Sequence, residues 1–245
     1  MKQLYNTIGV GYANLRKPDP RIAQAINTVL GDAKTVLNVG AGTGSYEPSD
    51  RIVTALEPST EMIRQRLPGA PKAHQGVAEH IPFEDNQFDA AMAVLTVHHW
   101  SDAEAGLLEM RRVAKNRLVI LTFDPAAPYF WLADYIPEII TIDQPIMPKL
   151  SEFERILGET KVTPIPVPHD CIDGFLGAYW RRPRAYLNPL VRASISTFPK
   201  LDDISDALAN LESDLNSGVW EAKYGHLMEL DSLDIGYRLV VTDCS

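Results

Sequence analysis

The chain has few cysteines, no long apolar run and no excess of basic side chains. Its 245 residues include only two cysteines, Cys171 and Cys244, which have no metal-ligand spacing and make no disulfide framework. No apolar run approaches the roughly 20 residues that a membrane-spanning helix requires. A net charge of −9 disfavours a nucleic-acid partner, because phosphate contacts need a basic face. We therefore expect no metal site, no membrane association and no nucleic-acid partner.

The first residues also lack the apolar segment of a signal peptide, which predicts a cytoplasmic protein. An apolar content of 45% and a charged content of 22% are those of an ordinary globular chain. A chain of this length can bury a large core within one α/β domain. We expect a single domain over residues 1–245, present as a monomer or homodimer.

Short apolar runs alternate with helical patterns in the first half of the chain. The runs lie at 35–39, 52–56, 88–97 and 117–123. They are rich in Val, Ile and Leu without polar alternation, as in parallel strands that are covered on both faces. Between them apolar residues recur three and four apart, and Ser59 and Asp102 stand where helix caps are expected. This order predicts a doubly wound α/β sheet.

The division of the chain into segments follows from changes in composition. A helical lead-in over 1–31 precedes a core over 32–123 that ends at Phe123. Residues 124–150 are rich in proline and aromatic side chains, which predicts a lid over the ends of the strands. Strand character returns at 161–167 and 230–243, and we expect residues 172–227 between them to form a helical insertion that caps the substrate site.

A glycine-dense turn, Gly40-Ala41-Gly42-Thr43-Gly44, follows the first predicted strand. Glycine permits positive φ and lets a ligand touch the backbone, and in an open α/β sheet this edge binds ligands. A dinucleotide fingerprint, G-x-G-x-x-G, would need glycine where Ser45 stands, which disfavours an NAD-dependent oxidoreductase. Any tight turn between a strand and a helix can be glycine-rich, so the turn needs support from a second feature.

That second feature is Glu57, at the end of the second predicted strand and 17 residues after Gly40. A carboxylate there can accept hydrogen bonds from both hydroxyls of a ribose. Met62 follows in the next helix, where it could pack on an adenine ring or belong to the core.

A third element is Gly76-x-Ala78-Glu79-x-Ile81-Pro82-Phe83, followed by Phe88-Asp89. Taken with the glycine turn and Glu57, it resembles the class I S-adenosylmethionine-dependent methyltransferases. More narrowly it resembles the type 11 branch, which includes the ubiquinone/menaquinone-biosynthesis enzymes. The resemblance implies a Rossmann-like seven-stranded sheet with an antiparallel last strand. It also implies S-adenosylmethionine as cofactor and S-adenosylhomocysteine as product.

The resemblance further implies a cofactor site built from the glycine turn and neighbouring strand ends: Gly40, Ala41, Gly42, Gly44, Glu57, Pro58, Met62, Ala78, Glu79 and Val94. The methionine moiety would lie on the glycines, the ribose on Glu57 and the adenine beside Ala78 and Glu79. In the lead-in, Tyr12 could contact the cofactor and Arg16 could meet its carboxylate, or both could belong to a surface helix. The family often has Asp where this chain has Val77, so the adenine amino group needs another acceptor.

His98 and His99 follow the fourth predicted strand, at the edge that borders cofactor and substrate. One could be the general base and the other structural, because neighbours on an extended strand point to opposite faces. Methyl transfer is an in-line displacement, so positioning alone could also suffice. The chain lacks the Asn/Asp-Pro-Pro-Tyr element of amino-group methyltransferases of nucleic acids, which favours a small-molecule acceptor.

The acceptor is the least defined part of this prediction. Aromatic residues of the lid and the arginines of the insertion, Arg181, Arg182, Arg184 and Arg192, could bind an aromatic or carboxylate-bearing metabolite. They could equally pack the insertion on the sheet and face solvent. A catalytically inactive methyltransferase-like binding subunit is the alternative to an enzyme.

Overall fold

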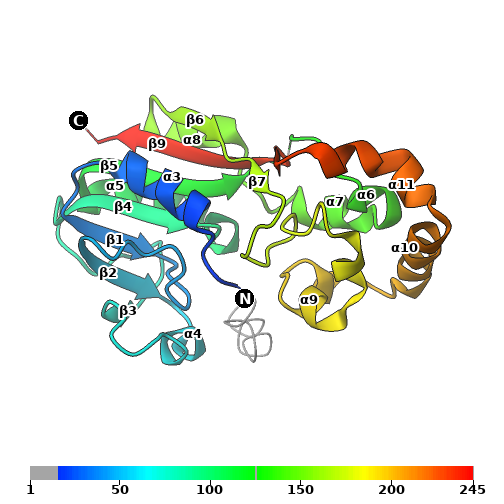
Figure 1. Cartoon of the computed structure of the whole chain (residues 1–245). Helices are drawn as coiled ribbons and strands as arrows, with labels where there is room; N and C mark the ends of the chain where they lie inside the picture. Colours follow the sequence, from blue (N-terminus) through cyan, green and yellow to red (C-terminus); the bar gives the residue numbers. More distant parts are fainter. Residues whose placement is uncertain (1–15, 125, 245) are drawn as a thin grey trace.

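The computed structural model describes residues 16–124 and 126–244. Residues 1–15 of the predicted lead-in, with the predicted cofactor contact Tyr12, lie outside the described residues. In Figure 1 the sheet occupies one half of the molecule and a group of short helices the other.

Seven strands form one sheet in the order β3-β2-β1-β4-β5-β9-β6. Their bounds are β1 Thr35–Val39, β2 Ile52–Glu57, β3 Ala73–Gln75, β4 Phe88–Val94, β5 Ala114–Phe123, β6 Lys161–Pro164 and β9 Tyr237–Asp243. Strands β1 to β5 are parallel, whereas β9 lies antiparallel between β5 and β6. The predicted doubly wound, Rossmann-like sheet with an antiparallel last strand is confirmed.

Helices cover both faces of the sheet, which is why its central strands show no polar alternation. One face of β1 and β4 packs Val36 and Met92 in a cluster with α3 (Pro20–Leu30). The opposite face packs Leu37 and Ala91 with α5 (Ala103–Val113) and α8 (Leu150–Leu157).

The first three described α-helices begin where the sequence supplies a cap. Ser59 accepts a hydrogen bond from the N–H of Met62 at the start of α4 (Thr60–Arg64), and Asp102 accepts one from Ala105 in α5. Both predicted caps are confirmed. Asp19 caps α3 in the same way.

Several strand boundaries differ from the sequence prediction. β5 begins at Ala114 rather than residue 117, and the predicted strand 230–243 becomes two separate strands, of which the longer, β9, begins at Tyr237. β4 ends at Val94 rather than residue 97, because Leu95 adopts a left-handed φ of 51° and Val97–His99 form a 3₁₀ turn, η1. The predicted strand 161–167 is divided into β6 and the short β7 (Val167–Pro168), which pairs with β8 (Ser232–Leu233). Strand β3 is too short for any periodicity to reveal it.

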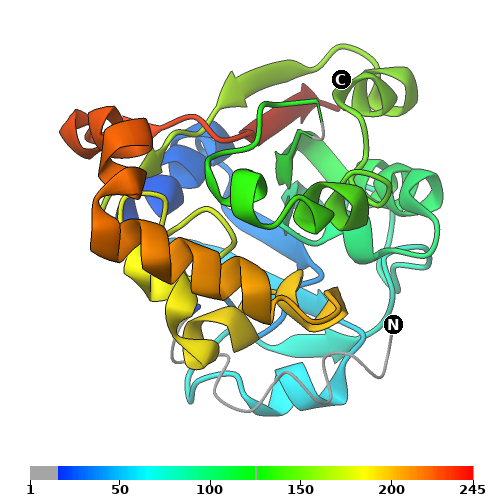
Figure 2. The same ribbon diagram turned by 90° about the vertical axis from the view of Figure 1, so that its right-hand side faces the viewer.

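Residues 126–147 and 172–229, which we call the cap, lie over the carboxyl ends of the strands. The cap contains α6 Leu132–Tyr135, α7 Glu138–Asp143, η2 Pro183–Leu187, α9 Pro189–Ala193, η3 Phe198–Lys200, α10 Ser205–Ser217, α11 Val219–Tyr224 and η4 Gly225–Glu229. Figure 2 views the molecule from this side, with α10 crossing in front of the sheet. In the second segment of the cap, residues 172–229, helical structure begins only at Pro183. Residues 172–182 form turns and bends and the isolated bridge between Asp173 and Arg16. A Cβ on Gly177 would lie 1.8 Å from Ile235, so the chain turns closely against the segment before β9.

An aromatic cluster holds the helices of the cap together. Trp131 lies edge-on to Trp220 and Tyr186, with ring centroids 5.4 and 5.6 Å apart. Its indole N–H donates to the carbonyl of Trp180 at 2.7 Å. These aromatic side chains are therefore the core of the cap.

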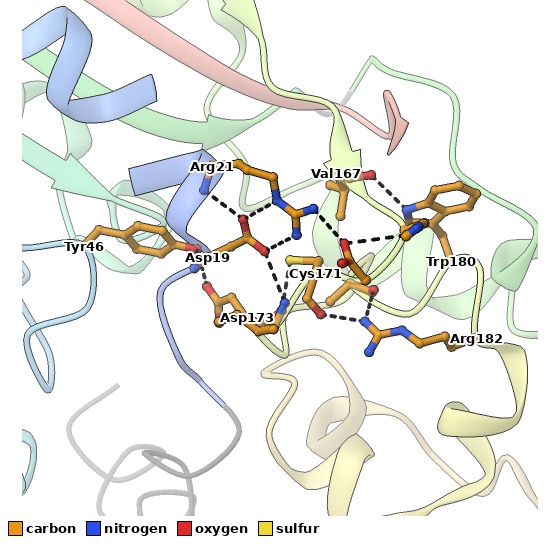
Figure 3. A network of polar contacts seen from close by, with 12 residues as sticks. Asp19, Arg21, Tyr46, Val167, Cys171, Asp173, Trp180 and Arg182 are labelled. Carbon is orange, nitrogen blue, oxygen red and sulfur yellow. Dashed lines mark hydrogen bonds and ion pairs between the residues drawn. The ribbon is translucent and has the colours of Figure 1, made fainter. Parts of the chain in front are cut away.

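A buried polar network joins the cap to the start of α3 and to the loop after β1 (Figure 3). The Asp173 carboxylate, 1% exposed, accepts from Arg16 Nε at 2.6 Å and from the Tyr46 hydroxyl at 2.8 Å. Asp19 lies beside it, where its backbone N–H donates to Tyr46 and its carboxylate binds Arg21. The network therefore ties together three segments that are far apart in the sequence.

We expect Asp173→Ala to lower the free energy of unfolding by about 3–5 kcal/mol, because it removes the buried carboxylate that binds both Arg16 and Tyr46. Asp170→Ala is the matched control, since this exposed carboxylate pairs with Arg21 at 2.7 Å and its loss should cost at most about 1 kcal/mol. Urea denaturation followed by fluorescence measures both. Equal losses in the two variants would contradict the role of Asp173.

Candidate functional site

A cavity of about 460 Å³ opens at the carboxyl edge of the sheet, beneath the cap. Of the residues that the sequence predicts for the site, its lining includes Arg16, Gly40, Ala41, Gly42, Glu57, Pro58, Met62, Ala78, Glu79, Val94, His98 and His99. The cap and the neighbouring strand ends add Phe123, Asp143, Met147, Phe175, Leu176, Ile195, Ser196, Thr197 and Tyr237. One cavity thus brings the predicted residues together with a second group from the cap.

The glycine turn needs its glycines for conformation and for space. Gly40 and Gly42 have φ of 69° and 53°, in the left-handed region. A Cβ on Gly40 would lie 2.1 Å from the Thr96 hydroxyl, so the turn lies directly against the end of β4. At Gly42 the nearest atom, Met62 Cε, is 3.6 Å away, and the backbone there borders the cavity.

Gly44 is placed differently from the other two glycines, because it does not line the cavity. A Cβ there would lie 3.0 Å from Glu47 and 3.2 Å from Arg66. These two side chains form a buried ion pair of 2.6 Å, and Arg66 also donates to the Gly42 carbonyl. The absence of a side chain at Gly44 therefore leaves space for the Glu47–Arg66 ion pair, which supports the turn on the side away from the cavity.

Glu57 holds the turn from the cavity side. Its buried carboxylate accepts from the N–H of Gly42 at 2.8 Å and from the N–H of Ser59 at 2.9 Å. Burial raises the pKa of Glu57, although these two hydrogen bonds oppose the effect. Each oxygen keeps a further lone pair, so the carboxylate can accept two more donors from a ligand.

Asn38, the last polar residue before the turn, was not among the predicted site residues. Its side chain is buried, and Nδ2 donates to Glu47 at 3.1 Å. Its Oδ1 has no hydrogen-bond partner and belongs to a residue that lines the cavity. An unpartnered buried acceptor suits a donor group of a ligand. An amide interrupting an apolar strand was the signal for it in the sequence.

Glu79 is partly committed to the protein. Its Oε1 accepts from the N–H and hydroxyl of Ser101 and from the N–H of Asp102, and so holds the start of α5. Burial opposes its ionisation, but these hydrogen bonds outweigh burial and lower the pKa of Glu79. Val77, where the family often has Asp, is 43% exposed and lines the cavity.

His98 and His99 lie in the 3₁₀ turn η1 and not on an extended strand. Their rings are therefore neighbours, with centroids 3.8 Å apart, and both line the cavity. Burial lowers the pKa of His98 well below its usual value, and the charges of His99, Lys200 and Arg16 lower it further. Burial, with the charges of Lys200 and Arg16, lowers the pKa of His99 to about 4. Both imidazoles are neutral at pH 7.

Arg16 reaches the cavity, but its guanidinium pairs with Asp173. The four arginines named for the substrate, Arg181, Arg182, Arg184 and Arg192, lie outside the lining and donate to backbone carbonyls. Arg182 donates to Cys171 and Ala178, and Arg192 donates to Tyr186.

Comparison with known proteins agrees with this geometry. Residues 37–121 match the model of a methyltransferase domain family. A crystal structure from Anabaena variabilis, described as that of a methyltransferase from an antibiotic biosynthesis pathway, is 35% identical, with a TM-score of 0.87, over 93% of this chain and 98% of that one.

Curated relatives match over shorter stretches. The ubiquinone/menaquinone biosynthesis C-methyltransferase UbiE of Citrifermentans bemidjiense is 34% identical over 41% of this chain and 51% of its own length. The 2-methyl-6-phytyl-1,4-hydroquinone methyltransferase 2 of Oryza sativa is 27% identical over 42% of this chain and 33% of its own length. The chain thus spans about half or less of these curated relatives.

The chain belongs to the class I S-adenosylmethionine-dependent methyltransferases, in the type 11 branch. This confirms the resemblance found in the sequence, together with S-adenosylmethionine as the cofactor of the family.

We expect Glu57→Ala to weaken S-adenosylhomocysteine binding by about 1–3 kcal/mol, because the change removes a charged acceptor and releases the Gly42 N–H. Titration calorimetry measures the affinity. The control is Glu61→Ala. The Glu61 carboxylate in α4 does not line the cavity; it accepts a hydrogen bond from Gln65 and forms an ion pair with Arg64. Unchanged affinity in Glu57→Ala would contradict its assignment to the ribose.

The lowered histidine pKa values predict a pH dependence of stability. Between pH 6.5 and about 4 the unfolded chain binds protons on His98 and His99 that the folded chain excludes. This stabilising contribution is complete above pH 6.5 and is lost as the pH falls. The free energy of unfolding should therefore decrease less on acidification in a His98→Asn, His99→Asn variant than in the parent. His226→Asn, which changes an exposed histidine, should keep the parental decrease, and the same decrease in all three proteins would refute the prediction.

Proposed function

We propose that the protein transfers the methyl group of S-adenosylmethionine to a small-molecule acceptor by in-line displacement. The observation that carries the proposal is one cavity in which the glycine turn, Glu57 and the end of β4 meet an aromatic wall from the cap and from the ends of β5 and β9.

The residues present fit the cofactor. Gly40 and Gly42 offer backbone without a side chain, and the unpartnered Asn38 Oδ1 offers an acceptor beside them for the methionine moiety. Glu57 has free lone pairs for the ribose hydroxyls, and Ala78 with Met62 supplies apolar surface for the adenine. Val94, whose backbone we assign to the cofactor amino group, ends β4 at the same cavity. The bound cofactor supplies an electrophilic methyl group on a sulfonium.

The chain contributes positioning and exclusion of water. A turn held by Glu57 on one side and by the Glu47–Arg66 pair on the other gives the methyl donor a fixed place. Alignment of donor and acceptor can supply roughly 7–11 kcal/mol of the barrier without a further catalytic group. The cap covers the site and limits the access of water.

We assign His98 and His99 to shaping the site and accepting hydrogen bonds, rather than to strong general-base catalysis. A neutral imidazole is available at pH 7, but a pKa near 4, as in His99, makes it a weak base. Of the two, the ring that borders the acceptor can still orient a hydroxyl or amine.

An apolar or aromatic acceptor fits the wall of the cavity better than a carboxylate-bearing one. Phe123, Phe175 and Tyr237 contribute aromatic faces. The arginines that favoured a carboxylate bind backbone carbonyls, and Arg16 is paired with Asp173.

Location and assembly complete the proposal. Cys171 and Cys244 are both free thiols, which agrees with a cytoplasmic protein. Within residues 16–124 and 126–244, every helix is too short or too polar to cross a bilayer. We propose a monomer or homodimer with its binding site inside one chain.

Turnover of methyl-labelled S-adenosylmethionine on a pool of metabolites tests the proposal. We expect label to move to a small molecule, with His98→Ala and His99→Ala each lowering the single-turnover rate by less than about tenfold, because positioning carries most of the effect. The matched control is Gly40→Ala, which should abolish transfer because its Cβ meets Thr96. Cofactor binding with no transfer would favour an inactive binding subunit, and tight NAD binding without S-adenosylmethionine binding would favour an oxidoreductase.

A further inference from the structure

The cap side of the cavity carries one acidic side chain that the proposed reaction does not use. Asp143 is the last residue of α7, is 5% exposed and lines the cavity. It lies in the same lining as Phe123, Phe175 and Tyr237, and the Tyr237 ring contacts those of Phe175 and Phe123 with centroids 4.5 and 5.5 Å apart. A buried carboxylate and an aromatic wall therefore line the same cavity.

The hydrogen-bonding capacity of Asp143 is mostly unused. Both carboxylate oxygens accept from one group, the Thr197 hydroxyl, at 3.1 and 2.9 Å. That hydroxyl has a single hydrogen, whereas a carboxylate can accept about four hydrogen bonds. Within the described residues no Lys, Arg or His side chain forms an ion pair with Asp143, and the exposed Lys200 acts on it only through space.

Burial without a cationic partner makes this carboxylate costly to ionise. Burial raises the pKa of Asp143, against the opposing effects of the Thr197 hydrogen bond and of Lys200. The pKa values of Tyr129 and Tyr237 are also raised, first by burial and in part by the charge of Asp143, which places both phenols within the electrostatic reach of this carboxylate. A cation brought by a ligand would remove this cost.

We propose that Asp143 binds a protonated amine of the acceptor substrate, with the faces of Phe175 and Tyr237 beside it. The inference rests on the proposed function, since it names the class of acceptor for the same site. A cation over an aromatic face is stabilised further, and more strongly where water is excluded.

The charges around the cavity favour a cation over an anion. Among the described residues that line it, Arg16 is the one permanently cationic side chain, and Asp173 neutralises it. Burial keeps His98 and His99 neutral at pH 7. A carboxylate-bearing acceptor would therefore meet Asp143 without an available counter-charge.

Three probes of one shape test the proposal: 2-phenylethylamine, 2-phenylethanol and 3-phenylpropionate. Their affinities are measured by titration calorimetry on the whole chain saturated with S-adenosylhomocysteine. We expect the amine to bind at least about tenfold more tightly than the alcohol, and the carboxylate most weakly. In Asp143→Asn, which keeps the shape of the side chain, the amine should lose that advantage while the alcohol is unaffected. Asp202→Asn, a change to an exposed carboxylate of the cap, should keep the wild-type order.

An amine that binds no more tightly than the alcohol, or a preference that persists in Asp143→Asn, overturns the assignment. S-adenosylhomocysteine affinity, measured first on every variant, verifies that each is folded. It also separates the two hypotheses, because failure of the parent to bind this product contradicts the proposed function. In that case, the affinities of the same three probes are measured on the chain without S-adenosylhomocysteine, which still tests the charge preference at Asp143.

Discussion

The carboxylate of Asp173 joins three parts of the molecule that the chain order keeps apart. Arg16 precedes the first described helix, Tyr46 ends the glycine turn and Asp173 opens the cap, and all three meet through contacts of 2.6 and 2.8 Å. Inside the protein such a network is stable only when every member is satisfied. The position of the cap and the conformation of the cofactor turn therefore depend on one another, because Arg16 and Tyr46 both bind this one carboxylate.

The turn is also held from its other sides before any ligand is present. Glu57 accepts the N–H of Gly42, and Arg66 donates to the carbonyl of the same residue while it pairs with Glu47. Thr96 fills the space beside Gly40. A backbone that is fixed by groups on several sides loses little freedom on binding, which is the physical advantage of a preorganised site. The unpartnered Asn38 Oδ1 is consistent with this view, because an acceptor left open in a satisfied network is available to a ligand.

The sequence was sufficient for the half of the molecule whose constraints are local. Unalternating apolar runs identify parallel strands, and the carboxyl ends of those strands necessarily share one edge, so the glycine turn and Glu57 could be placed together. Where tertiary contacts decide, the sequence was insufficient. The left-handed conformation of Leu95 ends β4 early and brings the rings of His98 and His99 together. No pattern in the sequence predicts this conformation. The role of the cap arginines could not be predicted either. The sequence does not distinguish an arginine that donates to backbone carbonyls from one that binds substrate.

The acceptor side shows why substrate identity is the harder inference. Phe123, Asp143, Phe175, Thr197 and Tyr237 come from five separate segments, so no local motif contains the site. The cap that brings them together has its own aromatic core around Trp131 and is tied to the sheet through Asp173. Substitutions at the acceptor wall can therefore change the shape and charge of that wall without altering the cofactor turn. Under the assignment proposed here, Asp143, which is buried and has no ion-pair partner among the described residues, indicates the class of acceptor more directly than any local motif.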